Sequence, residues 1–359
     1  MREIVGFDPT TKYTPPLLLK NGLIQTVYIA LWMDKQWEKT TKLVEPEYKE
    51  HIFIGANDVP IFGIVAIPHQ SYCRGTIIGT YGITGDLENQ WFLRLLGRKA
   101  YAQGYAVVLF DWRAHGKTAQ LSPTLTSDGL YEGEDFVRIA AQAKKIGCPS
   151  KFWFTGYSLG GKLALWGIAA ASNLSETALG LGLEDKDIGG CGVICPSLDA
   201  WRSLLYLEKN PLGRYLEKKI TQSLKDLAYR LYEYHPKDID PKVLQLTNSI
   251  REFDQYLVIP SLGFETVADY YYASSPFRIL SKINKPTLII YAQDDPMFDP
   301  TIIQDLQLTV KNNQMLDLIL TKNGGHVGYI SSYFSQNQSK DPDRWWAWNR
   351  FLKWLSDKY

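Results

Sequence analysis

Short runs of β-branched and aromatic residues alternate along the chain with longer stretches whose apolar residues recur at helical spacing. Between residues 51 and 321 this alternation is typical of βαβ units built around a mostly parallel sheet. Eight runs have the length and composition of strands, namely 51–55, 61–67, 76–81, 106–110, 151–155, 191–195, 287–291 and 316–321. We therefore expect an α/β fold in which an eight-stranded, mostly parallel sheet is flanked by helices.

The connections between these runs predict how neighbouring strands pair. Only a short polar segment with Asn57 and Asp58 separates the first two runs, which favours a hairpin at an antiparallel edge. The later connections are long enough for crossover helices, and helical patterns cover 90–103, 132–145, 159–171, 300–312 and 344–354.

The connection between the sixth and seventh predicted strands, 196–275, is much longer than the others. Leucines recur in it at helical spacing, and a structureless loop of this length would be unusual in a compact domain. We expect a helical cap over the carboxyl edge of the sheet. The predicted organisation is an N-terminal extension over 1–50 packed on the core, then one α/β domain over 51–359 that includes a cap insertion at 197–275.

Charge and cysteine content narrow the classes of partner. The 39 Lys and Arg residues balance 38 Asp and Glu residues, so the chain has no overall basic surface for nucleic acid. We expect a small-molecule or lipid partner without a large charge, and no nucleic acid. The four cysteines show no metal-ligand spacing and are too few for a disulfide framework, which favours reduced thiols and a cytoplasmic location.

The N-terminal residues contain no recognisable targeting or membrane segment. Residues 1–13 mix charged with apolar side chains and lack the apolar core of a signal peptide. The apolar stretch 17–33 is interrupted by Lys20, Asn21, Gly22 and Gln25, so we expect no membrane span there. Peripheral association with a membrane is left open, and the sequence carries no indication of an oligomeric state.

The strongest local motif is Gly156-Tyr157-Ser158-Leu159-Gly160-Gly161, which follows a predicted strand and precedes an apolar helix. In this context the motif predicts a nucleophile elbow, a strained turn that presents the serine hydroxyl above the sheet. The alternative is an ordinary strand-to-helix turn. The strand-turn-helix context favours Ser158 as a catalytic nucleophile.

A serine nucleophile needs a general base, and an acid orients that base. The order of these groups in such folds is serine, acid, histidine, which leaves His235 and His326 of the five histidines. His235 lies in a polar part of the cap and is expected to be solvated. His326 follows the last predicted strand in a glycine-rich turn and is the predicted base.

Two carboxylates, Asp294 and Asp295, follow the seventh predicted strand, where the acid belongs. Only one is needed. The position in the turn favours Asp295 as the acid, and Asp294 is expected to cap the turn or to face solvent.

Acyl transfer also needs donors that stabilise an oxyanion. We expect these to be the backbone N–H groups of Leu159, after the nucleophile, and Ile83, in the glycine-containing loop after the third strand. Tyr81, Gly82 and Tyr157 flank these positions and are predicted to contact the substrate. Asp111 and His115 are interpreted as scaffold, and the predicted chemistry needs neither a metal ion nor an organic cofactor.

An extended set of residues resembles the YheT-like hydrolases, family four of the AB hydrolase superfamily. The set runs from near residue 13 to residue 330 and comprises Pro15-Pro16, Gln25-Thr26, 156–160, Asp254, Gly263-Phe264, Asp269-Tyr270-Tyr271, Ser275, Ile283, Pro286, Leu288, Ile290, Asp294-Asp295 and 325–328. The resemblance implies an esterase or lipase acting on acyl glycerols, phospholipids or medium-chain esters, with transfer of acyl groups to alcohols in some members. Such enzymes usually carry His-Gly where this chain has Tyr81-Gly82.

The function predicted from the sequence is hydrolysis of a carboxylic ester through an acyl-serine intermediate. An acyltransferase with the same triad is the first alternative, and a catalytically silent binding protein is the second. In the C-terminal segment, Trp345, Trp348, Leu352 and Leu355 form a stripe expected to pack on the sheet. Trp346 lies off this stripe and is the residue expected to be free to touch lipid.

Overall fold

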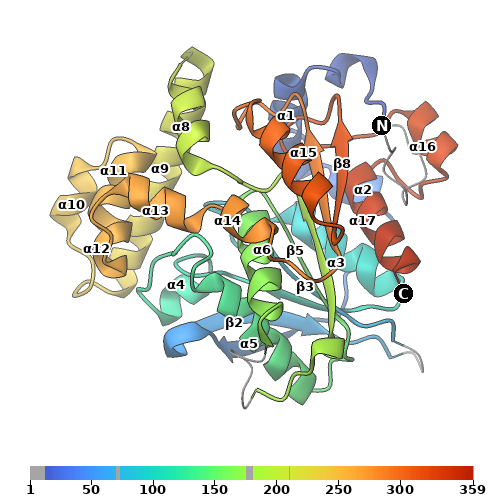
Figure 1. Ribbon diagram of the computed structural model, residues 1–359, viewed down its shortest axis with the longest axis horizontal. Helices are drawn as coiled ribbons and strands as arrows, with labels where there is room; N and C mark the ends of the chain where they lie inside the picture. Colours follow the sequence, from blue (N-terminus) through green and yellow to red (C-terminus); the bar gives the residue numbers. More distant parts are fainter. Residues whose placement is uncertain (1–12, 70–72, 175–180, 210, 359) are drawn as a thin grey trace.

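One eight-stranded sheet forms the centre of the computed structural model, which describes residues 13–69, 73–174, 181–209 and 211–358 (Figure 1). The strand order is β1-β2-β4-β3-β5-β6-β7-β8. The strands are β1 (Lys49–Ile54), β2 (Pro60–Ala66), β3 (Thr76–Thr80), β4 (Ala106–Phe110), β5 (Phe152–Tyr157), β6 (Ile188–Ile194), β7 (Thr287–Ala292) and β8 (Leu316–Thr321). β2 pairs antiparallel with both β1 and β4, and the other pairs are parallel. The predicted fold class is confirmed.

Helices cover both faces of the sheet (Figure 1). One face carries α3 (Trp91–Ala102) and α17 (Trp346–Asp357), and the other carries α5 (Glu132–Lys145) and α6 (Leu159–Ala171). β3 to β7 are therefore buried along their whole length, because parallel strands between two helical layers have no solvent-facing side. The remaining elements of the α/β core are η3 (Ala56–Asp58), α4 (Thr118–Leu121), η4 (Asp185–Asp187), α14 (Phe277–Leu280), α15 (Ile302–Asn312) and α16 (Tyr333–Ser339).

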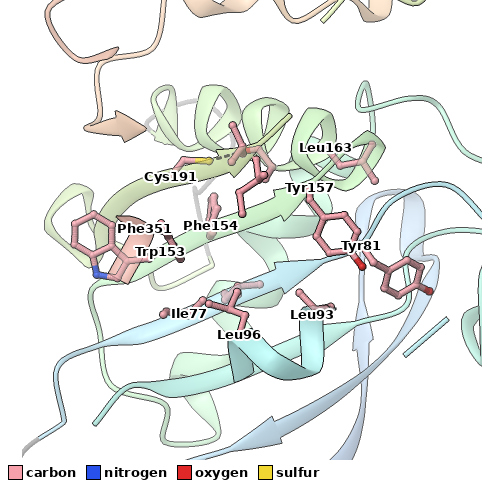
Figure 2. Close-up of a cluster of buried hydrophobic side chains, with 14 of the residues drawn as sticks. Ile77, Tyr81, Leu93, Leu96, Trp153, Phe154, Tyr157, Leu163, Cys191 and Phe351 are labelled. Atoms are coloured by element: carbon pink, nitrogen blue, oxygen red, sulfur yellow. Dashed lines mark hydrogen bonds between the residues drawn. The ribbon is translucent and has the colours of Figure 1, made fainter. Parts of the chain in front are cut away.

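The apolar core lies between the central strands and the helices on each face. Figure 2 shows part of it, with side chains from β3, α3, β5, α6, β6 and α17: Ile77, Leu93, Leu96, Trp153, Phe154, Leu163, Cys191 and Phe351. Gly192 of β6 lets α17 approach the sheet closely, because a Cβ there would lie 2.3 Å from the ring of Phe351.

Two faces of the C-terminal helix α17 carry tryptophans, and the structure buries both of them. Trp348 is fully buried and its Nε1–H donates to the Phe92 backbone oxygen at 3.0 Å. Trp346 is only 1% exposed, and its ring stacks on Tyr329 at 5.8 Å. The expectation that Trp346 is free to touch lipid is therefore wrong. The second face of the helix is covered because the chain around Ile330 pairs with Trp345 and Tyr13 packs on Trp346.

The connection between β6 and β7 folds into a helical lobe beside the carboxyl edge of the sheet (Figure 1). It contains α8 (Ala200–Glu208), α9 (Pro211–Tyr234), α10 (Pro241–Leu246), α11 (Ile250–Phe253), the π-helical turn η5 (Asp254–Val258), α12 (Ile259–Leu262) and α13 (Val267–Ser274). The lobe has its own apolar cluster, which includes Leu224, Leu227, Leu231, Leu244, Phe253 and Tyr270. We refer to these helices as the cap.

The segment before β1 contains η1 (Leu17–Leu19), α1 (Gly22–Leu31), η2 (Met33–Lys35) and α2 (Trp37–Thr40). Residues 1–12 lie outside the described residues, and they make up most of the segment 1–13 that was weighed as a signal peptide. α1 and its flanks expose large apolar side chains, namely Leu17, Leu18, Ile24, Val27, Leu31 and Trp32. Among the helices of the described residues, none combines the length and hydropathy needed to cross a membrane.

Candidate active site

Ser158 lies at the sharp turn between β5 and α6. Its backbone has φ 54° and ψ −127°, a strained conformation for a residue with a side chain. The turn is possible because its neighbours are glycines: a Cβ on Gly156 would lie 2.3 Å from the Gly160 oxygen, and one on Gly160 would lie 2.3 Å from the Tyr81 oxygen. The motif therefore has the geometry of a nucleophile elbow.

A chain of hydrogen bonds joins Ser158, His326 and Asp295. The Ser158 hydroxyl lies 2.9 Å from Nε2 of His326, and Nδ1 of His326 lies 2.8 Å from Oδ2 of Asp295. Because the carboxylate accepts from Nδ1–H, Nε2 of the neutral ring is free to accept the serine proton. Oδ1 of the buried Asp295 accepts a second hydrogen bond from the Met297 N–H at 2.8 Å. The arrangement can generate a nucleophilic serine.

Asp294 lies beside this chain of hydrogen bonds but does not join it. Its Oδ1 accepts from the Gly325 N–H at 2.9 Å, and its backbone approaches Gly22 of α1 closely. Partial burial raises the pKa of the Asp294 carboxyl. The carboxyl therefore holds the turn that carries His326, which is closer to the first of the two expected roles, capping a turn, than to a purely solvent-facing one.

The N-terminal helix α1 also holds the histidine turn. Oγ1 of Thr26 accepts from the His326 backbone N–H at 2.8 Å and donates to the Gly22 oxygen at 2.7 Å. Gln25 is fully buried, and its Oε1 accepts from the Ile330 N–H at 3.0 Å and from the Tyr13 hydroxyl at 2.8 Å. The sequence reasoning missed these supporting roles, although Gln25-Thr26 was part of the pattern behind the family resemblance.

The expected oxyanion donors lie on two sides of Ser158. The N–H of Leu159 is at the first position of α6, where helices leave backbone donors without an internal acceptor. The N–H of Ile83 has no hydrogen-bond acceptor among the described residues. Gly82 comes close to the nucleophile, since a Cβ there would lie 3.5 Å from the Ser158 hydroxyl. The two N–H groups are therefore free to bind a substrate oxygen.

His115 supports the loop that contains Ile83. Its Nε2 accepts from the Thr84 N–H at 3.0 Å, its Nδ1 lies 2.8 Å from the Arg113 oxygen, and its ring stacks on Trp112 at 3.6 Å. Burial lowers the pKa of His115 to about 3, so the ring is neutral and Nε2 can accept. The other histidine weighed for the base, His235, bonds the Ala119 oxygen from the cap and is not simply solvated.

The three residues predicted to contact substrate are placed differently. Tyr81 and Tyr157 point into the core, as Figure 2 shows, and the cavity beside Ser158 is lined by neither. The Tyr81 hydroxyl donates to Asp111 at 2.5 Å, and the Tyr157 hydroxyl donates to Gln90 at 2.5 Å. Only Gly82 adjoins the nucleophile. Position next to Ser158 in the sequence does not decide whether a side chain reaches the cavity, because Leu159 lines it and Tyr157 does not.

An apolar cavity of about 130 Å³ extends from Ser158 and His326 into the cap. Most of its wall is aliphatic or aromatic and comes from α8, α9 and α11 together with the loops around Ile83 and Met297: Leu204, Leu207, Ile220, Leu224, Leu227, Ile250 and Phe253. Such a wall removes apolar surface of a ligand from water and suits a hydrocarbon chain.

One group in the described part of the chain has donor atoms close enough for a metal ion, namely Cys195, Asp295 and His326, within 4.8 Å of one another. The donor chemistry fits poorly. Nδ1 of His326 and Oδ2 of Asp295 are bonded to each other, and burial raises the pKa of the Cys195 thiol, which disfavours the thiolate that metals bind. A metal at this place would require the hydrogen bond between Asp295 and His326 to break.

The comparisons with known proteins agree on an α/β-hydrolase fold and on proteins named esterase. Residues 76–333 match a family model described as alpha/beta hydrolase fold. Two relatives are named "Putative esterase": slr0264 of Synechocystis sp., 50% identical with 97% of this chain and 95% of the relative covered, and YheT of Escherichia coli, 28% identical with 80% and 78% covered. The solved structure of the Pyrococcus furiosus esterase Pf2001 is similar in fold, with a TM-score of 0.53, 18% identity, and 86% of this chain and 92% of that chain covered.

Proposed function

The chain belongs to the α/β-hydrolase family and is an enzyme of the esterase and lipase type, and from this premise we propose that it hydrolyses carboxylic esters through an acyl-serine intermediate. The observation that carries the proposal is the continuous hydrogen bonding from Ser158 through His326 to Asp295. The resemblance to YheT-like hydrolases, seen first in scattered motifs, is confirmed by the relative from Escherichia coli.

In the first step, Oγ of Ser158 attacks the ester carbonyl carbon while Nε2 of His326 takes the hydroxyl proton. Asp295 holds the ring in the required tautomer and stabilises the imidazolium. The carbonyl oxygen becomes an oxyanion and is stabilised by the N–H groups of Leu159 and Ile83. The C–O bond to the alcohol then breaks, and the departing alcohol takes the proton from Nε2, which leaves the acyl group on Ser158.

In the second step, a water molecule attacks the acyl carbon and gives a proton to Nε2 of His326. The second oxyanion uses the same two N–H groups. When it collapses, the bond to Oγ breaks, Ser158 regains its proton from His326, and the carboxylic acid is released. Besides the ester and one water molecule, these steps use only groups of the chain itself.

The proposed substrates are acyl glycerols, phospholipids or medium-chain esters. The apolar wall of the cavity beside Ser158 supports a substrate with a hydrocarbon chain, and the family resemblance supports the same classes. An alcohol could replace water in the second step, in which case the products would be a new ester and no free acid.

A panel of esters with graded acyl length, assayed with the wild type and Ser158→Ala, tests the proposal. The wild type is expected to release free acid from apolar esters and to react with a fluorophosphonate, and the variant to do neither. New ester formed in the presence of added alcohol would reassign the chain to acyl transfer. If the wild type showed neither labelling nor turnover, the result would favour the second alternative, a catalytically silent binding protein.

For location, we propose the cytoplasm with peripheral contact to a lipid surface. Three of the four free cysteines are buried, which suits a reducing compartment. The exposed apolar side chains of α1 and its flanks lie on the helix that contacts the His326 turn, so binding there would bring lipid to the active site. Leu31→Lys should weaken sedimentation with neutral phosphatidylcholine vesicles, whereas Ile52→Lys, at an exposed position on β1, should not.

A further inference from the structure

Two carboxyl groups and a phenol interrupt the mostly apolar wall of the cavity beside Ser158. Asp254 of η5 and Tyr271 of α13 line the cavity from the cap, and Asp128 lines it from the loop before α5. The Tyr271 hydroxyl donates to Oδ2 of Asp254. The proposed hydrolysis does not use any of these residues, and a carboxyl group in an apolar wall is costly unless something pairs with it.

The positive charge of Lys162, which lies near Asp254, is already balanced by Asp128. Nζ of the buried Lys162 forms an ion pair with Asp128 at 2.7 Å and donates to the Ser274 hydroxyl at 3.2 Å. Lys162 lies one turn along α6 from the nucleophile, since its backbone N–H donates to the Ser158 oxygen at 3.2 Å. The polar group is therefore near the reacting serine and has no uncompensated positive charge that would attract an anion.

Asp254 keeps one oxygen available. Among the described residues Oδ1 has no hydrogen-bond partner, while Oδ2 accepts from Tyr271. The side chain is partly accessible and lines the cavity, and burial raises the pKa of its carboxyl to about 8. Burial therefore favours the protonated form of this carboxyl, in which Oδ1 can both donate and accept.

We propose that Asp254, oriented by Tyr271, binds a hydroxyl group of the substrate inside the cap cavity and makes the enzyme selective for hydroxylated esters. The inference rests on the proposed function and names its substrate class more closely. A hydroxyl can pair with Oδ1 in either protonation state of the carboxyl, whereas a carboxylate group would find no free cation there, because Lys162 is already paired with Asp128. The hydroxyl could be carried by the alcohol part of the ester, as in a partial glyceride, or by the acyl chain.

Matched substrates distinguish these sources. The three esters have equal size and carry one hydroxyl on the alcohol part, one on the acyl chain, or none. The wild type is expected to show a higher kcat/KM for one hydroxylated ester than for the plain ester. In Asp254→Leu this preference should fall by about 10-fold, the effect of one lost hydrogen bond to a buried partner. Tyr271→Phe should reduce it in part, and Asp254→Asn should retain more of it than Asp254→Leu.

Asp269→Asn is the matched control, because Asp269 is an exposed carboxylate on the same helix as Tyr271 and makes its hydrogen bonds to Thr266. Its selectivity should equal that of the wild type. An equal change in all variants, including Asp269→Asn, would reflect a general perturbation of the cap and would overturn the inference. An unchanged preference in Asp254→Leu and Tyr271→Phe would overturn it as well.

Binding of non-hydrolysable ether analogues, measured by calorimetry, separates this inference from the proposed hydrolysis. The hydroxylated ether should bind about 10-fold more tightly than the plain ether to the wild type and lose that advantage in Asp254→Leu. Equal affinity of both ethers for the wild type would overturn the inference even if esters are hydrolysed. A preference for the hydroxylated ether without ester turnover would instead refute the proposed function alone.

Discussion

The hydroxyl group of Thr26 accepts a hydrogen bond from the backbone N–H of His326 at 2.8 Å, across 300 positions of the sequence. The helix α1, near the start of the described chain, thereby fixes the turn that carries the proposed base. Catalytic groups lose activity when their support is loosened, even if their own chemistry is intact.

Thr26→Val should therefore lower kcat by about 10-fold, because the isosteric side chain cannot accept from the His326 N–H. Thr26→Ser, which retains the acceptor, should keep most of the activity. Steady-state kinetics of both variants on one short ester make the comparison, and thermal unfolding shows whether the fold is retained. Equal rates for the two variants would contradict a positioning role for Thr26.

Ser158→Ala and His326→Ala should each reduce ester turnover by about 10⁴-fold or more, because removing one member of a triad disables the unit. Both side chains are at the cavity and neither anchors the core, so the melting temperature should change little. Product release and calorimetry on the purified variants provide the measurements. Turnover close to that of the wild type in either variant would refute the triad assignment.

Asp295→Asn should lose far more activity than Asp294→Asn. Asp295 accepts from Nδ1 of His326, and a neutral amide cannot stabilise the imidazolium and favours the wrong tautomer. Asp294 accepts from the Gly325 N–H, a bond that the asparagine oxygen can retain. The kcat/KM values of the two variants decide the point, and the reverse ranking would transfer the role of the acid to Asp294.

Trp346→Ala and Trp348→Ala should both lower stability, by ~3 to 5 kcal/mol each, because both rings are buried. Urea unfolding measures the change, and vesicle sedimentation should show no specific loss of lipid binding. A stable Trp346→Ala variant that no longer binds vesicles would restore the reading of this tryptophan as a lipid contact.

Asp254→Asn should become more stable relative to the wild type as the pH rises. The pKa of the folded carboxyl, about 8, lies above the unfolded value, so the folded chain holds the proton more tightly. The stability that this proton confers is complete below roughly pH 4 and declines until about pH 8, whereas asparagine does not titrate. Urea unfolding of both proteins at several pH values across this window tests the trend, and a constant difference would contradict it.

Local patterns in the sequence were sufficient for the fold class, the eight strands and the residues of the proposed triad. Strand composition and helix periodicity are local properties, and the elbow motif needs only its flanking strand and helix to be recognisable. Chain order then reduced the histidines to two and placed the acid within a pair of neighbouring residues.

The environment of individual side chains was decided by the tertiary structure. Trp346 lies off the helical stripe, yet it is buried because Tyr13 and Tyr329, both distant in sequence, pack on it. Tyr81 and Tyr157 flank proposed catalytic positions in the sequence but point into the core. The support of His326 by Thr26, and the free oxygen of Asp254 in the cap cavity, depend on segments that meet only in the folded chain. Spacing along the sequence predicts which residues share an element, but burial and pairing depend on contacts between elements, which no local pattern contains.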